Sequence, residues 1–547
     1  MNNTLRYALL LCGALMVSHS SRAQTIPPAT RADSMLQCDF SVVKSSNAWF
    51  TAPNAAGLSQ WKSAHITSAR LSLVNQDGGF ADYYEAPKAL TLRADVEAFY
   101  RLSPRINLYG RMAYDNVAAR HAAGSYFFAP QHMPFDIVED SLTNTGRKHT
   151  DLYQLTGALS ATLAHGIAIG AKVDFAAANY AKYKDLRHKN NVLDLTATAG
   201  ILVPVGSFLH AGAHFAYRRN TENIRFATYG NSDKVYKSLI NYGAFIGKIE
   251  QFGENGYTDQ NRDMPFLSEH TGGGLQAEIL FSPALTLYNA FDFAYQKGYY
   301  GKKSSYTLSY NQHKGHEYGY QGRLTWQATG ATHQLTAQLA IDNLTDYGNS
   351  YRADVDKTTG ASRYNYYTPL KLSNKVWTDI TVAYRGTYGS NPYLPLLDIT
   401  IGMHRWERKQ TAYVYPYFRR QHLRQHEWLA EAAYNATLKG GVLTPALAFS
   451  YSKGSGKPFT DGTFATPSDR QAPPPQMETY LMREYLYHTA PQYSLRLSLR
   501  YAFLLPHTAM KAYAEGGWQL RKANTHDDDY LDARQRRTLW LTIGCQW

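Results

Sequence analysis

The sequence of 547 residues has few of the features that mark enzymes or helical membrane proteins. It contains only three cysteines, and beyond its leader no apolar run reaches the roughly eighteen residues that a membrane-spanning helix requires. It has no Gly-x-Ser-x-Gly motif, and no carboxylate or cysteine stands at metal-ligand spacing beside the pairs His313/His316 and His422/His426. We therefore expect no transmembrane helix, no enzymatic activity, no cofactor and no metal.

The net charge of +13 and the pI near 9.2 would suit a nucleic-acid-binding protein if the basic residues were gathered in a tract. They are instead spread along the whole chain, so we expect no nucleic-acid partner.

The first residues predict secretion. Arg6 gives a positive start, residues 8–17 are apolar, and Ser21-Arg22-Ala23 ends in a small residue, which is the pattern of a signal peptide over residues 1–23. In an oxidising compartment Cys38 and Cys545 could pair, although two unpaired small apolar residues are favoured.

Residues 89–115 predict a β-hairpin. Polar side chains alternate with apolar ones along both arms, and Ser103-Pro104 stands between the arms as a tight turn. An alternation with a period of two is typical of a strand with one apolar and one polar face. The apolar face of the first arm comprises Leu90, Leu92, Ala94, Val96, Ala98, Tyr100 and Leu102.

The same alternation recurs to the end of the chain and predicts about eighteen strands, an even number as bacterial barrels require. The predicted strands are 64–75, 89–102, 105–116, 150–164, 167–180, 192–203, 207–219, 271–282, 285–298, 315–328, 332–345, 374–386, 396–408, 424–438, 442–453, 490–503, 508–520 and 534–547. Short connections alternate with long ones, of which the longest are 117–149, 220–270, 346–373 and 454–489. This asymmetry predicts an all-β fold, a transmembrane antiparallel β-barrel over 64–547 with short periplasmic turns and long extracellular loops.

The last predicted strand alternates and ends on Trp547. A terminal strand ending on an aromatic residue resembles the assembly signal of outer-membrane barrels. The resemblance implies two partners, outer-membrane lipid and the barrel-assembly machinery, and a location in the outer membrane of a Gram-negative bacterium. The leader, the regular recurrence of strands, Trp547 and the stretch Asn54-Ala55-Ala56-Gly57-Leu58 together resemble the large, mostly uncharacterised outer-membrane barrels of Bacteroidota-type bacteria.

Residues 24–63 do not alternate, and we predict either a periplasmic tail or a segment that plugs the lumen. Large side chains in this segment need burial, which favours a plug. The plug candidates are Trp49, Phe50, Asn54, Leu58 and Trp61. The stretch Asn54-Ala55-Ala56-Gly57-Leu58 resembles the Asn-Pro-Ala-Gly-Leu segment of FadL-type channels for hydrophobic compounds, with Ala55 in place of the proline.

Charged residues on the predicted inward faces could line a solute path. The lumen candidates are Arg93, Asp95, Glu97, Arg111, Glu278, Arg323, Glu431, Arg496, Arg500 and Glu515. The mixed signs argue against strong ion selectivity. Two functions stay open: a channel or transport protein for a small solute, and a surface-exposed binding or accessory protein of a nutrient-uptake system whose long loops hold a partner.

Overall fold

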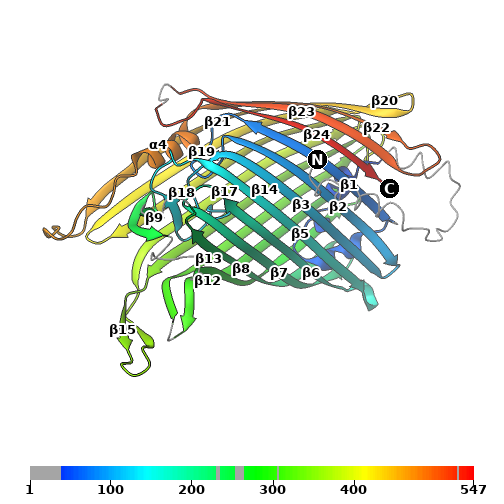
Figure 1. Cartoon of the computed structure of the whole chain (residues 1–547). Coiled ribbons are helices and arrows are strands. Elements are labelled where there is room, and N and C mark those ends of the chain that lie inside the picture. The colour runs from blue at the N-terminus through cyan, green and yellow to red at the C-terminus, as the bar shows by residue number, and fades with distance from the viewer. Residues whose placement is uncertain (1–37, 64, 230–234, 253–263, 305–306, 526–528) are drawn as a thin grey trace.

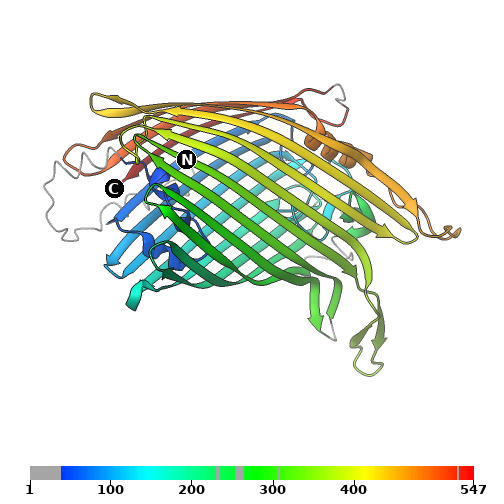
Figure 2. The same ribbon diagram turned by 180° about the vertical axis from the view of Figure 1, so that it is seen from behind.

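The structure is a computed structural model, and it describes residues 38–63, 65–229, 235–252, 264–304, 307–525 and 529–547. Tilted strands form one continuous wall around a lumen (Figure 1). The same wall seen from behind has no open edge (Figure 2). Among the described residues, no helix is long and apolar enough to cross a membrane.

The wall is a closed antiparallel barrel of 18 strands, counted over the described residues. The strands are β1 (His65–Asp77), β2 (Lys88–Ser103), β3 (Ile106–Ala122), β5 (Gly146–Thr162), β6 (Ala168–Lys182), β7 (Arg187–Val205), β8 (Leu209–Ala227), β11 (Met264–Ser282), β12 (Leu285–Ser304), β13 (Thr307–Ala328), β14 (Ala331–Gly348), β17 (Leu370–Tyr388), β18 (Leu397–Val414), β19 (Tyr417–Tyr434) with its continuation β20 (Ala436–Leu438), β21 (Gly441–Thr463), β22 (Gln492–Leu504), β23 (Lys511–Ala523) and β24 (Gln535–Gln546).

The barrel closes where β24 pairs with β1. Leu541 lies opposite Leu73, and the backbones of Thr67 and Trp547 exchange two hydrogen bonds of 2.8 and 3.1 Å. Closure gives every strand two neighbours, so the wall leaves no unpaired edge, as a barrel in lipid requires. The predicted class, a transmembrane antiparallel β-barrel, is confirmed.

Side chains alternate between the two surfaces of the wall as the sequence predicted. Leu541 on β24 and Leu447 on β21 are 57% and 48% exposed on the outer surface, whereas Asp95 on β2 is 3% exposed on the inner one. The outer surface is therefore apolar where lipid would contact it, and the inner surface carries the charges.

The long connections differ from the expectation that they are simple outer loops. Residues 117–149 contain β4 (Asp136–Glu139), residues 220–270 contain β9 (Tyr236–Gly243) and β10 (Ile246–Phe252), and residues 454–489 contain the helix α4 (Glu478–Thr489). Strands β4, β9 and β10 form a small sheet of their own. The remaining long connection forms a separate hairpin, β15 (Tyr351–Val355) with β16 (Ser362–Tyr366), which projects from the barrel (Figure 1).

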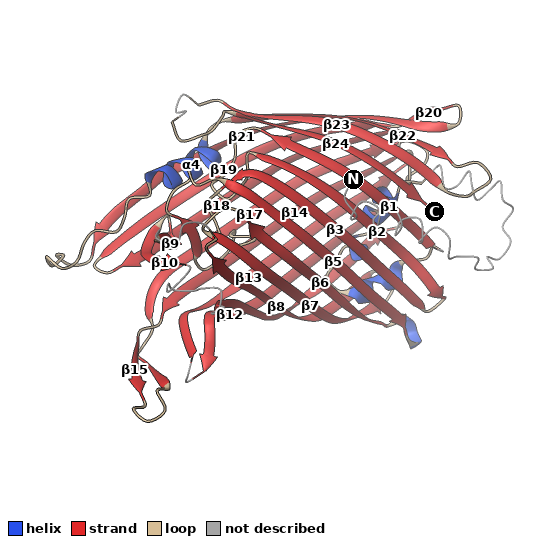
Figure 3. Cartoon of the chain, in the orientation of Figure 1, coloured by secondary structure: helices blue, strands red, loops and turns tan. Residues whose placement is uncertain are grey.

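The helices lie at the two ends of the barrel (Figure 3). At the end with the short turns are α3 (Phe40–Ser45), η1 (Ala48–Phe50) and η2 (Ala55–Gln60), all from the N-terminal segment, and the turn helix η3 (Ala164–Gly166). At the other end lies α4. The N-terminal segment thus lies at one end of the barrel, and the long connection that contains α4 lies at the other.

Candidate functional site

The described N-terminal segment, residues 38–63, lies inside the barrel at the end with the short turns. Its 3-10 helix η2 contacts β3, β5, β6 and β7. Asn54 begins this helix, and its side-chain oxygen accepts a hydrogen bond from the backbone N–H of Ala56 at 3.0 Å. Gly57 is required because a Cβ there would come within 2.8 Å of the Cβ of Trp49. These contacts explain why asparagine and glycine stand in the Asn54–Leu58 stretch.

Glycines on three neighbouring strands form the recess that receives this segment. A Cβ on Gly170 would lie 2.2 Å from the Ala56 nitrogen, and one on Gly200 would lie 2.2 Å from Asn54 Oδ1. Gly170 and Gly200 face each other across β6 and β7, and Gly212 on β8 has the Trp49 ring 2.8 Å from its own Cβ position. The wall therefore lacks side chains where the N-terminal segment approaches it most closely.

Hydrogen bonds also join the wall to the N-terminal segment. Asn107 donates to the Leu58 carbonyl at 2.8 Å, and Ser160 donates to the Ala56 carbonyl at 3.2 Å. The Asn54 amide donates to the Ile201 carbonyl at 3.0 Å and to Gln276 Oε1 at 3.0 Å. Side chains of the wall thus donate to backbone carbonyls of the segment, and the wall accepts from the Asn54 side chain.

An aromatic cluster joins the segment to β2. Phe99 stacks on Trp61 with 4.8 Å between ring centroids, and Phe50 meets Trp61 edge to face at 5.3 Å. Phe40 and Leu58 belong to the same buried group. Four of the five plug candidates are therefore buried, and Phe50 is half-buried.

Ion pairs and charged hydrogen bonds hold the rest of the segment. Lys44 Nζ lies 2.6 Å from Glu97, and Arg500 lies 2.8 Å from Asp39. Burial raises the pKa of Asp39, but Arg500 and Lys511 outweigh burial and hold that pKa below its ordinary value. On the opposite wall Arg323 donates to the Ser45 carbonyl at 3.1 Å.

Of the lumen candidates, Glu97, Glu278, Arg323 and Arg500 thus contact the N-terminal segment. The others pair within the wall. Arg111 lies 2.8 Å from Asp95, with Arg93 at 4.0 Å from the same carboxylate. Arg496 lies 2.9 Å from Glu431. Glu515 accepts a hydrogen bond from the Trp540 indole at 3.1 Å.

The connections at the opposite end fold together into what we call the loop layer: residues 78–87, residues 123–145 with β4, the β9–β10 hairpin and α4. Tyr83, Val138, Phe245 and Tyr480, one from each part, pack in one buried cluster. Inward side chains of the wall reach this layer, as when Lys375 donates to the Met133 carbonyl at 3.1 Å. The loop layer therefore occupies the second end of the lumen.

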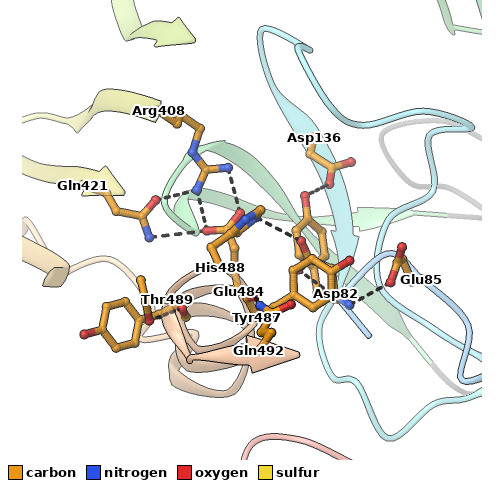
Figure 4. Close-up of polar contacts among 12 residues, drawn as sticks. Asp82, Glu85, Asp136, Arg408, Gln421, Glu484, Tyr487, His488, Thr489 and Gln492 are labelled. Carbon is orange, nitrogen blue, oxygen red and sulfur yellow. Dashed lines mark hydrogen bonds and ion pairs between the residues drawn. The ribbon is translucent and has the colours of Figure 1, made fainter. Parts of the chain in front are cut away.

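Buried charges fasten the loop layer to the wall. Arg408 on β18 binds Glu484 of α4 at 2.7 Å and Gln421 at 2.7 Å (Figure 4). Burial raises the pKa of Glu484, but Arg408 outweighs it and the pKa lies below its ordinary value. Lys182 on β6 likewise lies 2.6 Å from Glu139 on β4, both side chains being at most 1% exposed.

Asp136 and Glu139, both on β4, are loop-layer acids whose pKa burial raises, and of the two Asp136 lacks a paired cation. Asp136 accepts hydrogen bonds from Ser125 at 2.6 Å and Tyr83 at 3.0 Å, but it has no cation at ion-pair distance among the described residues. Burial raises its pKa to about 6, which these hydrogen bonds only partly oppose. Titration of this carboxyl makes the stability of the layer depend on pH.

The loop layer was missed by the sequence analysis. Its signals were the apolar run Tyr126-Phe127-Phe128 and the stretch 477–489, which contains no glycine or proline. Within the described part of the chain, no group of three His, Cys, Asp or Glu side chains could hold a metal ion. Cys38 and Cys545 are not joined by a disulfide. The predicted signal peptide, residues 1–23, lies outside the described residues.

The fold defines a class: a closed transmembrane β-barrel with a folded segment at each end of its lumen. Within that class, the chain belongs to DUF6850, a family of unknown function whose model matches residues 55–547. This agrees with the resemblance to uncharacterised outer-membrane barrels. No curated protein matches the sequence significantly.

Several solved structures are similar to the barrel. The ferric preacinetobactin receptor BauA of Acinetobacter baumannii is 9% identical with a TM-score of 0.40, and the match covers 88% of this chain and 80% of that one. The outer membrane transporter YddB of Escherichia coli is 6% identical with a TM-score of 0.41, covering 89% and 81%. The Pseudomonas putida toluene transporter TodX is 10% identical with a TM-score of 0.29, covering 90% and 92%. Likenesses at this level carry no argument about a substrate.

Proposed function

We propose that the protein is a gated transport barrel in the outer membrane of a Gram-negative bacterium, passing a small solute when the N-terminal segment moves. The observation that carries this proposal is the recess of Gly170, Gly200 and Gly212, into which residues 49–56 fit. The N-terminal segment occupies this recess without being part of the wall, so it can leave the recess and open the lumen while the barrel stays closed. The polar inner surface would then be the solute path.

The N-terminal segment and the loop layer lie at the two ends of the lumen, and the contribution of each to closing it can be tested separately. Gly200→Leu places a side chain where Asn54 lies, so it should displace the N-terminal segment. Lys182→Met should loosen the loop layer by leaving Glu139 unpaired. Gly157→Leu is the matched control for the first change, because nothing lies within 4 Å of a Cβ at that position.

The measurement is single-channel conductance and liposome swelling, with trypsin access at Lys44 and Lys62 reporting the position of the segment. We expect low conductance for the unchanged protein and for Gly157→Leu, and the largest conductance for Gly200→Leu combined with Lys182→Met. If protease shows both ends open in the combined variant and no solute passes, the transport proposal fails.

A second function, binding of a surface partner, is favoured by one observation. The β15–β16 hairpin projects beyond the barrel (Figure 2). It carries the exposed side chains of Arg352, Lys357 and Arg363. Trypsin added to intact cells should cut this hairpin and spare the turns at Ser103 and Gly440. Deleting residues 351–366 should leave conductance unchanged if transport is the function, and it should abolish partner capture if binding is.

A further inference from the structure

A second group of charges lies on the outer surface of the barrel, on strands β18, β19 and β21. The odd-numbered residues of β18 share their face with Ile401, which is 57% exposed, and the even-numbered residues of β19 share theirs with Trp428, which is 49% exposed. Residues that face each other across two strands lie on the same face of a sheet. Lys409 therefore points outward with its cross-strand partner His422, and Lys457 points outward because it too lies opposite His422.

This outward face is strongly basic. Its cations are Arg405, Lys409, Arg420, Arg424, Lys453 and Lys457. Among the described outward residues of β18, β19 and β21 beyond Trp428, the one acid is Glu407. Arg405, Lys409 and Arg424 already lie 2.5, 3.1 and 3.4 Å from its carboxylate. One carboxylate cannot neutralise six cations, so the cluster keeps a large positive excess.

A cavity of about 570 Å³ opens among these cations. Lys409, Arg420, His422 and Lys457 line it, together with Thr411 and Thr460. It lies where the pairing of β19 with β21 shifts in register between Arg420 and His422, which interrupts the regular row of side chains. Arg420 and Lys457 are both exposed, and neither forms a salt bridge with a carboxylate of the described residues.

The position of the cluster along the barrel indicates which molecules it meets. A row of outward aromatic rings precedes it: Trp428 stacks on Tyr451 at 6.0 Å, and Tyr451 lies 5.1 Å from Tyr493. Such rows lie at the level of the lipid headgroups. The next outward pair, His426 opposite Lys453, begins the basic face, which continues toward the end with the long loops.

We infer that the cavity among Lys409, Arg420, His422 and Lys457 binds the phosphate-bearing headgroup of an outer-leaflet lipid. Arg and Lys side chains recognise phosphate through charge-assisted hydrogen bonds, and the two threonine hydroxyls could donate to the same group. Like charges on neighbouring strands repel unless an anion lies between them. The inference rests on the outer-membrane location proposed above, but it does not depend on solute passage.

The test uses the full chain in neutral-detergent micelles doped with diphosphorylated lipid A. Binding is measured by native mass spectrometry and by titration of intrinsic fluorescence. The variant Lys409→Gln/Arg420→Gln/Lys457→Gln removes three cations of the cavity. Arg352→Gln/Lys357→Gln/Arg363→Gln removes the same charge from the β15–β16 hairpin and is the matched control. Heat-modifiable migration in gels verifies that each variant forms a barrel.

We expect the cavity variant to bind the lipid roughly tenfold to a hundredfold more weakly, and the control to bind as the unchanged protein does. Lipid A freed of its phosphates should bind weakly to all three. Rising salt should weaken binding by the unchanged protein and have less effect on the cavity variant. Equal binding by the cavity variant and the control would overturn the inference.

Two further outcomes separate the possible ligands. Competition by millimolar inorganic phosphate as effective as that by lipid A would indicate a free-phosphate site and would overturn the assignment to a lipid. Loss of lipid binding with unchanged conductance of the opened barrel would support the inference while leaving the transport proposal intact. Conversely, absence of conductance in every variant would refute transport without changing the lipid result.

Discussion

The indole N–H of Trp49 donates a hydrogen bond of 2.9 Å to Glu278, although the two residues are 229 positions apart in the sequence. One belongs to the N-terminal segment and the other to β11. His210 on the neighbouring strand lies 2.9 Å from the same carboxylate oxygen. This contact places a side chain of the segment directly on the charged inner surface of the wall.

The Trp49–Glu278 contact should contribute measurably to seating the segment. A double-mutant cycle with Trp49→Phe and Glu278→Met, which remove the donor and the acceptor, should give a coupling of about 1.5–3 kcal/mol, because a hydrogen bond to a charged acceptor is stronger than a neutral one. Hydrogen exchange of residues 48–58 measures it. Glu431→Gln, whose partner Arg496 lies elsewhere on the wall, is the control and should not alter exchange there. Additive single effects would show that the bond does not hold the segment.

The buried pair of Lys182 and Glu139 should stabilise the loop layer. Lys182→Met should destabilise it by about 3–5 kcal/mol, since it leaves a buried carboxylate without its partner. Lys172→Met on the same strand removes one member of a more exposed pair with Asp174 and should cost about 1 kcal/mol or less. Protease access to residues 117–149 reports the difference. Restored protection in Lys182→Met/Glu139→Gln would show that the unpaired charge is the cause, whereas equal effects of the two single variants would contradict the prediction.

Asp136 should make the loop layer less stable as the pH rises. Burial raises its pKa from 3.8 to about 6, so the folded layer holds its proton more tightly than the unfolded chain does. The stabilisation is complete below about pH 4 and is lost as the pH rises through 6, amounting to about 3 kcal/mol. Hydrogen exchange of residues 136–139, corrected for intrinsic rates, should therefore quicken between pH 4 and 7. Asp136→Asn should flatten this profile, and an unchanged profile would assign the titration to another group.

Closure of the barrel should fail when the last strand is altered. Leu541→Arg places a charge on the outer surface, where Leu541 is 57% exposed, at a cost of about 2–4 kcal/mol in lipid. Leu541→Ala is the control and should assemble. Deletion of Trp547 removes both backbone hydrogen bonds to Thr67 and the predicted assembly signal. Outer-membrane fractionation with heat-modifiable migration is the measurement, and normal levels of the deletion would refute a role for Trp547.

The sequence by itself determined which segments form the strands of the barrel wall and which of their side chains face the lumen. The alternation of apolar and polar residues is a local property of a strand, so it predicted eighteen segments that the structure confirms, and it predicted which face of β2 carries Arg93 and Asp95. Most observed strands are longer than predicted. β21, for example, runs from Gly441 to Thr463, because pairing continues beyond the alternating part of the sequence.

The tertiary structure alone decided what occupies the lumen and what gathers on its outer surface. Asn54, Trp49 and Trp61 were candidates from their need for burial, but their contacts depend on glycines and polar side chains of distant strands. The loop layer joins four connections whose side chains show no common period. The basic cavity likewise exists only because the strand register places Lys457 and Lys409 on opposite sides of His422. Periodicity reports the environment of a residue along one strand, whereas these contacts depend on which strands become neighbours when the barrel closes.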